Sequence, residues 1–85
     1  MKVTLEISNY PLDQEFEDKI LDFINRFKAH GIKLRVNATS THVTGDYDAV
    51  MSVLQKEIKT SFEQYGKMIV VVKVLKGELD INFTL

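Results

Sequence analysis

The chain has 85 residues, 45% of them hydrophobic and 27% charged, and its formal net charge at pH 7 is -1. This balance excludes an extensively disordered chain and gives no electrostatic reason to expect a nucleic acid or an anionic membrane as a partner. Cysteine is absent, which excludes disulfides and thiolate metal sites, and no apolar run approaches the roughly 20 residues of a membrane-spanning helix. We therefore expect a single cytoplasmic domain over residues 1–85, with no membrane insertion.

The first half of the chain predicts a strand, a helix and a second strand. Apolar and polar side chains alternate over residues 2–8, which is typical of a strand with one buried face, and Pro11 ends it. Over residues 13–30 apolar side chains recur at helical spacing, acidic residues begin the segment and basic ones end it, and Gly31 supplies a stop. Alternation returns over residues 32–37 and predicts the second strand, whose outward side is basic.

The second half predicts a strand, a longer helix and another strand. In the third strand we expect Thr41 and Val43 to point toward the core. Asp46 is expected to cap a second helix over residues 47–65, in which apolar and aromatic side chains recur every three or four positions. The run over residues 68–75 is almost wholly apolar, which predicts a strand covered on both faces.

The last segment, residues 78–85, alternates strictly between polar and apolar side chains and predicts an extra C-terminal edge strand. The order of the other elements predicts an α+β fold, a ferredoxin-like two-layer sandwich (βαββαβ) in which both helices cover one face of an antiparallel sheet. The first and third strands then lie side by side at the centre of this sheet.

This topology brings polar residues of the central strands together on the sheet face that no helix covers. The residues expected there are Glu6, Ser8, Ser40, His42 and Thr44. The last strand adds Ile69, Val71 and Leu75 beside them, and exposed apolar surface of this kind usually marks an interface. Because an 85-residue chain also has a small core, we expect a homodimer or a higher homo-oligomer.

Three functions known for this architecture are disfavoured by the residue types present. An RNA-recognition domain needs aromatic side chains on its central strands, and a metallochaperone needs a Cys-x-x-Cys pair. Glu6 and His42 are suited to metal binding or acid–base chemistry, but a dedicated metal site needs three or more ligands and only one histidine is near. We therefore expect no metal, no cofactor and no catalytic residue.

Several segments carry a more specific signal. They are Glu6-Ile-Ser-Asn-Tyr-Pro-Leu12, Gly31 before the second strand, Ser40-Thr-His-Val-Thr-Gly-Asp46 and Val70-Val-Val-Lys-Val74. Together they resemble the thiamine-binding, YkoF-like proteins over nearly the whole chain. The most specific elements are the Ser-x-Tyr-Pro-Leu turn at residues 8–12 and the Ser-Thr-x-Val-x-Gly-Asp segment at residues 40–46.

The resemblance implies a cytoplasmic protein that binds thiamine or its hydroxymethylpyrimidine moiety, that is linked to vitamin B1 uptake or salvage, and that performs no chemistry of its own. YkoF itself carries two such repeats in one chain, whereas this sequence has one. A homodimer would therefore have to supply what the tandem repeat provides.

The candidate ligand-binding residues are Glu6, Ser8, Tyr10, Ser40, Thr41, His42 and Thr44. Short hydroxyl and carboxylate groups on strands can pair with the ring nitrogens and the amine of an aminopyrimidine. Tyr10 offers a ring for stacking, and the carboxylate of Glu6 complements the positive thiazolium. We expect one pocket lined by these residues, with His42 and Thr44 at its edge.

Each of these residues also has a structural explanation. Hydroxyl side chains are common on exposed strands and in turns, and Tyr10 precedes a proline in a turn. The alternative function is therefore a self-associating regulatory or structural module without a thiamine ligand, in which the polar face and its apolar neighbours only join subunits.

Overall fold

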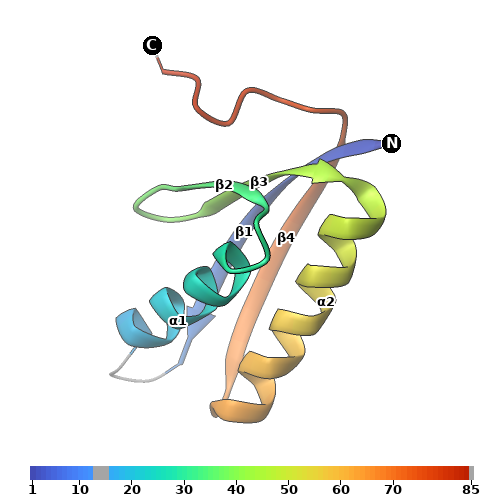
Figure 1. The fold of residues 1–85 in the computed structure, drawn as a ribbon. Coiled ribbons are helices and arrows are strands. Elements are labelled where there is room, and N and C mark those ends of the chain that lie inside the picture. Colours follow the sequence, from blue (N-terminus) through green and yellow to red (C-terminus); the bar gives the residue numbers. More distant parts are fainter. Residues whose placement is uncertain (13–15, 85) are drawn as a thin grey trace.

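The computed structural model describes residues 1–12 and 16–84, without the side chain of Phe16. Its helices and strands are β1 (Lys2–Pro11), α1 (Phe16–Lys28), β2 (Lys33–Val36), β3 (Thr41–Asp46), α2 (Tyr47–Gln64) and β4 (Met68–Lys76) (Figure 1). This is the order that the sequence predicts. The expected start of the first helix at Asp13 and the final residue, Leu85, lie outside the described residues.

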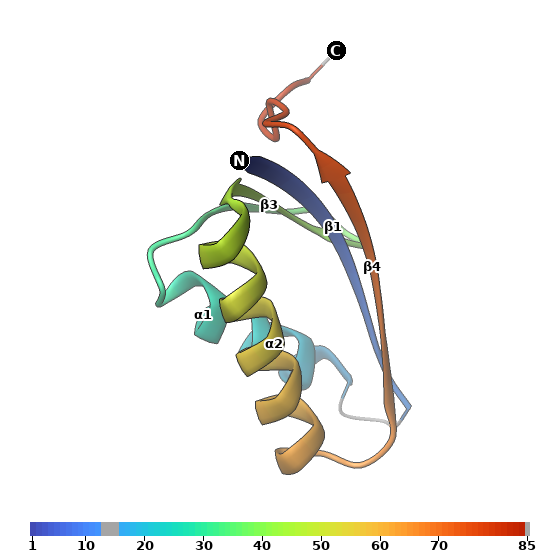
Figure 2. The ribbon, with the colours of Figure 1, turned by 90° about the vertical axis from the view of Figure 1, so that its right-hand side faces the viewer.

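The strands form one antiparallel sheet in the order β2-β3-β1-β4. Both helices pack against the same face, so that the sheet and the helices form two layers when they are viewed edge-on (Figure 2). β1 and β3 are the central pair, with Glu6 opposite His42 and Thr4 opposite Thr44. The predicted α+β ferredoxin-like sandwich is confirmed, and so is the central position of these two strands. We call the face without helices the open face; it carries Thr4, Glu6, His42 and Thr44.

The hydrophobic core lies between the sheet and the helices. Its members are Val3, Leu5, Ile7, Phe23, Phe27, Val43, Val50 and Leu54. β1 contributes every second residue, because alternate side chains of a strand point to the same face. In α1 the ring centroids of Phe23 and Phe27 are 5.6 Å apart and the rings are tilted by 50°. Gly45 allows α2 to approach the sheet closely, since a Cβ atom there would lie 3.0 Å from Cγ2 of Val50.

α2 begins where the sequence predicts, but it buries a partly different set of side chains. Asp46 occupies the N-cap position, yet its side chain makes no capping hydrogen bond; instead, its Oδ1 lies 3.6 Å from the amino group of Met1. The buried residues of the helix are Val50, Leu54, Glu57 and Ser61. Phe62, which shares the predicted apolar spacing, is 51% exposed. The second half of α2 therefore buries polar groups, and these face the polar end of α1.

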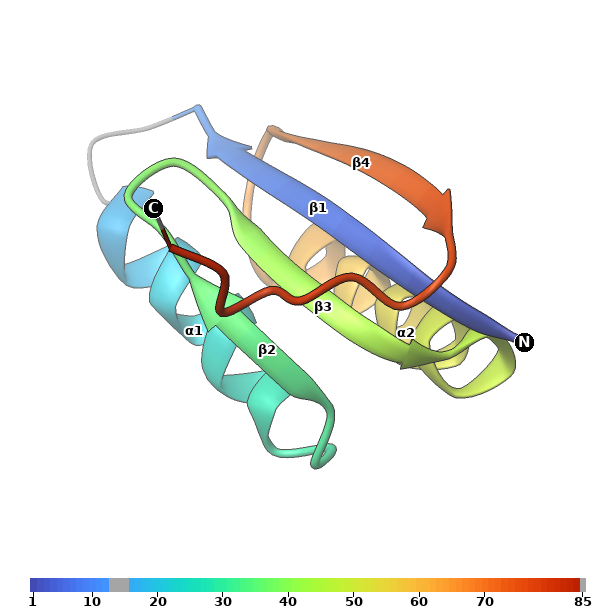
Figure 3. The ribbon, with the colours of Figure 1, turned by 90° about the horizontal axis from the view of Figure 1, so that it is seen from above.

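The C-terminal tail, residues 77–84, contains no strand, so the prediction of an extra edge strand is wrong for this described segment. At Gly77 the φ angle is 121°, a conformation that favours glycine, and the chain turns there to cross the open face (Figure 3). Thr4 anchors the crossing, because its Oγ1 accepts a hydrogen bond from the Leu79 amide (3.0 Å) and donates one to the Gly77 carbonyl (2.9 Å). Ile81 is buried. The alternation thus reflects a segment that packs on a sheet face instead of pairing at a sheet edge.

β4 lies at the sheet edge beside β1. The prediction that this strand is covered on both faces is wrong for the chain alone, because none of its side chains is fully buried. On the open face, Ile69, Val71 and Leu75 are 50%, 48% and 45% exposed. This confirms the expectation that these apolar side chains lie exposed beside the polar residues of β1, where Val71 is opposite Ser8.

Candidate functional site

Two pockets lie on opposite faces of the sheet. The first, which we call the helix-side pocket, has a volume of about 420 Å³ and lies between α1, the end of β1 and the loop that joins β2 to β3. Its apolar walls include Ile7, Ile20 and Phe23. Its polar lining consists of Asn9, Tyr10, Asn37, Thr39, Ser40 and Thr41. A cavity of this size with apolar walls and a few polar groups is suited to a small molecule.

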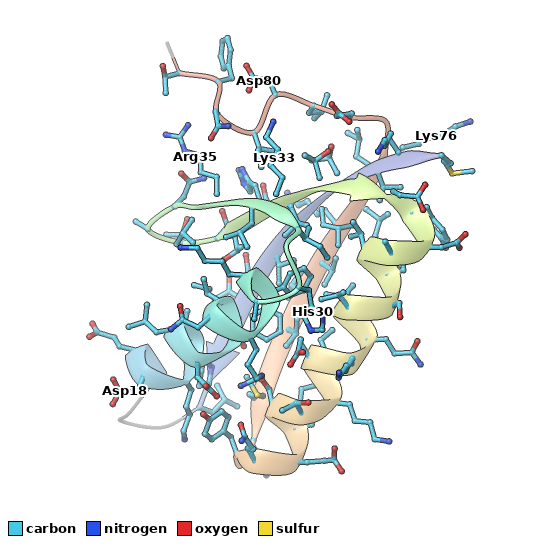
Figure 4. All side chains as sticks on the ribbon, viewed as in Figure 1. Asp18, His30, Lys33, Arg35, Lys76 and Asp80 are labelled. Carbon is cyan, nitrogen blue, oxygen red and sulfur yellow. The ribbon has the colours of Figure 1, made fainter. Side chains whose placement is uncertain are left out.

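The second pocket, which we call the open-face pocket, has a volume of about 390 Å³ and lies between the open face and the tail. Its lining includes the charged side chains of Glu6, Arg35, Lys73 and Asp80 and the imidazole of His42. Figure 4 shows Lys33 and Arg35 projecting from β2 toward the side of the sheet on which the tail and Asp80 lie. Ile81 and Phe83 of the tail line this pocket as well, so the tail lies over a surface that carries apolar side chains and charges of both signs.

The predicted ligand-binding residues are divided between these two pockets. Tyr10, Ser40 and Thr41 line the helix-side pocket, whereas Glu6 and His42 line the open-face pocket. Successive side chains on one strand point to opposite faces, so Thr41 and His42 are neighbours in sequence but lie on different sides of the sheet. The expectation of a single pocket is therefore not met.

The remaining two predicted residues, Ser8 and Thr44, line neither pocket. Thr44 is buried, and its Oγ1 donates a hydrogen bond to the Val3 carbonyl (3.2 Å). The same atom lies 3.4 Å from Oγ1 of Thr4, the residue that anchors the tail. The Thr44 hydroxyl therefore has a structural role within the chain, which requires no ligand.

The carboxylate of Glu6 already has two side-chain nitrogen atoms near it on the open face. Its Oε1 lies 3.5 Å from Nζ of Lys73, and its Oε2 lies 3.6 Å from Nε2 of His42. The ion pair with Lys73 is near solvent, since the Lys73 side chain is 77% exposed, so it contributes little to stability. His42 also lies 3.3 Å from Oγ of Ser40. Glu6 is therefore paired, and it is on the wrong face to complement a cation in the helix-side pocket.

Asn9 is a pocket residue that is not among the ligand-binding residues predicted from the sequence. The period of two that places Val3, Leu5 and Ile7 in the core also places Asn9 on that side of the sheet, where an amide is unusual. This alternation was the signal by which the residue could have been found. Asn9 lines the helix-side pocket, and its side-chain Oδ1 and Nδ2 are both buried.

A second polar cluster joins the two helices. Nε of Arg26 donates a hydrogen bond to Oε1 of Glu57 (2.8 Å), and Nε2 of His30 is hydrogen-bonded to Oε2 of the same carboxylate (2.8 Å). Arg26 also donates to Asp22 and to Ser61. Figure 4 shows His30 at the end of α1, between the helices. The cluster therefore occupies the part of the helix interface where the apolar spacing of α2 is interrupted.

The pKa of Glu57 reflects this setting. Burial by itself raises the pKa of this carboxyl, but hydrogen bonds from His30 and Arg26, together with their positive charge, outweigh burial and lower the pKa below its ordinary value. Tyr65 donates a hydrogen bond to Asp22 (2.6 Å), and this bond to a carboxylate, with burial, raises the pKa of the Tyr65 hydroxyl. The cluster is a set of mutually paired charges that holds α1 against α2.

Within residues 1–12 and 16–84, no group of three or more His, Cys, Asp or Glu side chains is arranged to hold a metal ion. Neither of the helices described here is long and apolar enough to cross a membrane.

The fold and the helix-side pocket define a ferredoxin-like α+β protein with a cavity of small-molecule size on the helix side of its sheet. Residues 5–77 match the family model described as thiamine-binding protein. The chain therefore belongs to the thiamine-binding protein family, which confirms the resemblance seen in its sequence.

Comparison with solved structures shows the same fold in several organisms. A protein from Thermotoga maritima, named for thiamine biosynthesis or salvage, has a TM-score of 0.85 at 17% identity, over 96% of this chain and 92% of that one. A protein from Methanocaldococcus jannascii has a TM-score of 0.78 at 23% identity, over 96% and 87% of the two chains. A domain of unknown function, DUF77, from Bacillus cereus has a TM-score of 0.77 at 17% identity, over 96% and 85%. No curated protein matches the chain.

Proposed function

We propose that this chain is a non-catalytic cytoplasmic binding protein for thiamine or its hydroxymethylpyrimidine moiety, linked to uptake or salvage of the vitamin. The ligand occupies the helix-side pocket. The family match over residues 5–77 supports thiamine as the ligand class, and the name of the Thermotoga maritima protein is consistent with it.

One observation carries the choice of pocket. The two segments that most resemble the family, residues 8–12 and 40–46, are far apart in the chain, but both contribute to the lining of the helix-side pocket. The first segment supplies Tyr10 and the second supplies Ser40 and Thr41, next to the apolar walls of α1. Hydroxyl groups beside an apolar cavity are the combination that orients a small heteroaromatic ring.

The proposal therefore retains Tyr10, Ser40 and Thr41 as ligand contacts. Glu6 and His42 line the pocket on the other face, and Ser8 and Thr44 line neither pocket, so we assign these four residues no contact with the ligand.

Calorimetric titration of the full chain with thiamine, its phosphates and hydroxymethylpyrimidine tests the proposal. Thr41→Val, which keeps the shape and removes the hydroxyl, is expected to weaken binding by about 1 kcal/mol, roughly fivefold, and Ser40→Ala by a similar amount. Tyr10 lies at the end of β1 opposite Ile69 and borders the pocket, so Tyr10→Ala is expected to weaken binding less than these two changes. Glu6→Ala is the matched control on the opposite face, and its affinity should equal that of the unmodified chain.

Two results would contradict the proposal. Absence of binding for every one of these ligands would remove thiamine as the ligand class. Weaker binding by Glu6→Ala, with Ser40→Ala and Thr41→Val unaffected, would move the site to the open-face pocket.

We also propose that the open face joins two copies of the chain. The half-exposed Ile69, Val71 and Leu75 of β4 form an apolar strip there, and Leu79 and Phe83 of the tail are 52% and 68% exposed. A chain that keeps this much apolar surface in water is typical of one that self-associates. This association is compatible with the proposed ligand site, because the helix-side pocket lies on the other face of the sheet.

A further inference from the structure

The helix-side pocket contains a side chain whose hydrogen-bonding groups are unused. Oδ1 and Nδ2 of Asn9 are both buried, and neither has a hydrogen-bond partner within the described part of the chain. Buried polar groups in folded proteins are nearly always paired, because an unpaired one loses its bonds to water without replacement. A ligand that supplies the missing partners accounts for an amide in this position.

Asn9 directs its side chain to the helix side of the sheet. It follows Ile7 by two residues on β1, so the two side chains project from the same face, and both line the helix-side pocket. Ile20 and Phe23 of α1 line the same cavity. A planar ring can therefore pack against apolar walls while one of its edges meets the Asn9 amide.

The chemistry of the amide matches one particular ring edge. An asparagine side chain presents one acceptor and one donor side by side. A 4-aminopyrimidine presents the complement, since its exocyclic amine donates and the adjacent ring nitrogen accepts. Asparagine forms the same pair of hydrogen bonds with the edge of adenine in DNA.

We propose that Asn9 binds the aminopyrimidine edge of the ligand through two hydrogen bonds and thereby selects this ring; the inference rests on the proposed function. Recognition then depends on the pyrimidine. Thiamine and hydroxymethylpyrimidine share the contact, and hydroxyethylthiazole, the other half of the vitamin, lacks it. A two-bond contact of this kind contributes about tenfold to a hundredfold in affinity.

The test uses Asn9→Leu in the full chain, which replaces the amide by an apolar group of similar size. Affinity for thiamine and for hydroxymethylpyrimidine is expected to fall about tenfold to a hundredfold, while the melting temperature without ligand stays the same or rises, because an unpaired buried amide is removed. Asn9→Ala enlarges the space instead of filling it, so a loss of binding in both variants excludes a steric block. Asn25→Leu, at an exposed position of α1, is the control and should bind like the unmodified chain.

The ligand panel separates failure of this inference from failure of the proposed function. If the unmodified chain binds thiamine and hydroxymethylpyrimidine, and both Asn9 variants bind them equally well, the role of Asn9 is overturned and the proposed function stands. Binding of hydroxyethylthiazole without binding of hydroxymethylpyrimidine also overturns it. If the chain binds adenine in an Asn9-dependent manner but neither of the two pyrimidine ligands, the edge contact is upheld and thiamine binding is overturned.

Discussion

The buried carboxylate between the helices offers the sharpest test of the structural reasoning. In Glu57→Gln the side chain keeps its shape but loses its charge. The native carboxylate, which is 5% exposed, accepts two charge-assisted hydrogen bonds of 2.8 Å from Arg26 and His30. A hydrogen bond to a charged group contributes about 1 kcal/mol more than a neutral one, so the two bonds together predict a loss of about 2 kcal/mol at pH 7.

This loss has a defined dependence on pH. The folded-state pKa of Glu57 is lowered from its ordinary value of 4.5, so the ionised carboxylate stabilises the fold at pH values above 4.5. The stabilisation is lost as the pH falls through the folded-state pKa, because both the folded and the unfolded chain are then protonated at this residue. The difference between the unmodified chain and Glu57→Gln should therefore shrink toward zero in acid.

Urea denaturation at pH 7 and at successively lower pH measures this difference directly. In a thermal scan, about 2 kcal/mol corresponds to a decrease of roughly 8–16 °C in melting temperature for a domain of this size. Glu63→Gln, an exposed position on the same helix, is the matched control and should change stability by less than about 0.5 kcal/mol. A difference for Glu57→Gln that is equally large at pH 3 and pH 7, or that is absent at pH 7, would refute the reasoning.

Two other predictions concern the tail and the open face. Ile81→Ala is expected to lower the free energy of unfolding by about 2 kcal/mol, because the side chain is buried. The Leu79 amide, which donates a hydrogen bond to Thr4, should exchange slowly with solvent. A freely exchanging amide and an unchanged stability would show that the tail is not held on the sheet. Sedimentation at about 50 µM should give at least twice the 9.8 kDa mass of one chain, and Val71→Lys should shift it toward the monomer. A monomer for the unmodified chain would contradict association through the open face.

Much of the fold was predictable from the sequence, because the spacing of apolar residues along a strand or helix determines which of its faces is buried. Val3, Leu5 and Ile7 alternate, so they form one face of a strand whatever covers them, and the helical spacing around Phe23 and Phe27 has the same consequence for α1. For the candidate site, the sequence singles out the segments around Tyr10 and Ser40, and the structure shows that both segments line the same pocket. Their role in ligand binding stays a prediction.

The tertiary structure alone decided how these parts combine. A period of two shows that a segment has two unlike faces, but it does not show what packs against them. The tail could therefore pair at a sheet edge or pack on a sheet face. The turn at Gly77 and the hydrogen bonds to Thr4 place it on the open face. The polar residue Glu57 becomes buried only because Arg26, distant in sequence, meets it across the helix interface. Pairings of this kind depend on contacts between residues far apart in the chain, and local periodicity carries no information about them.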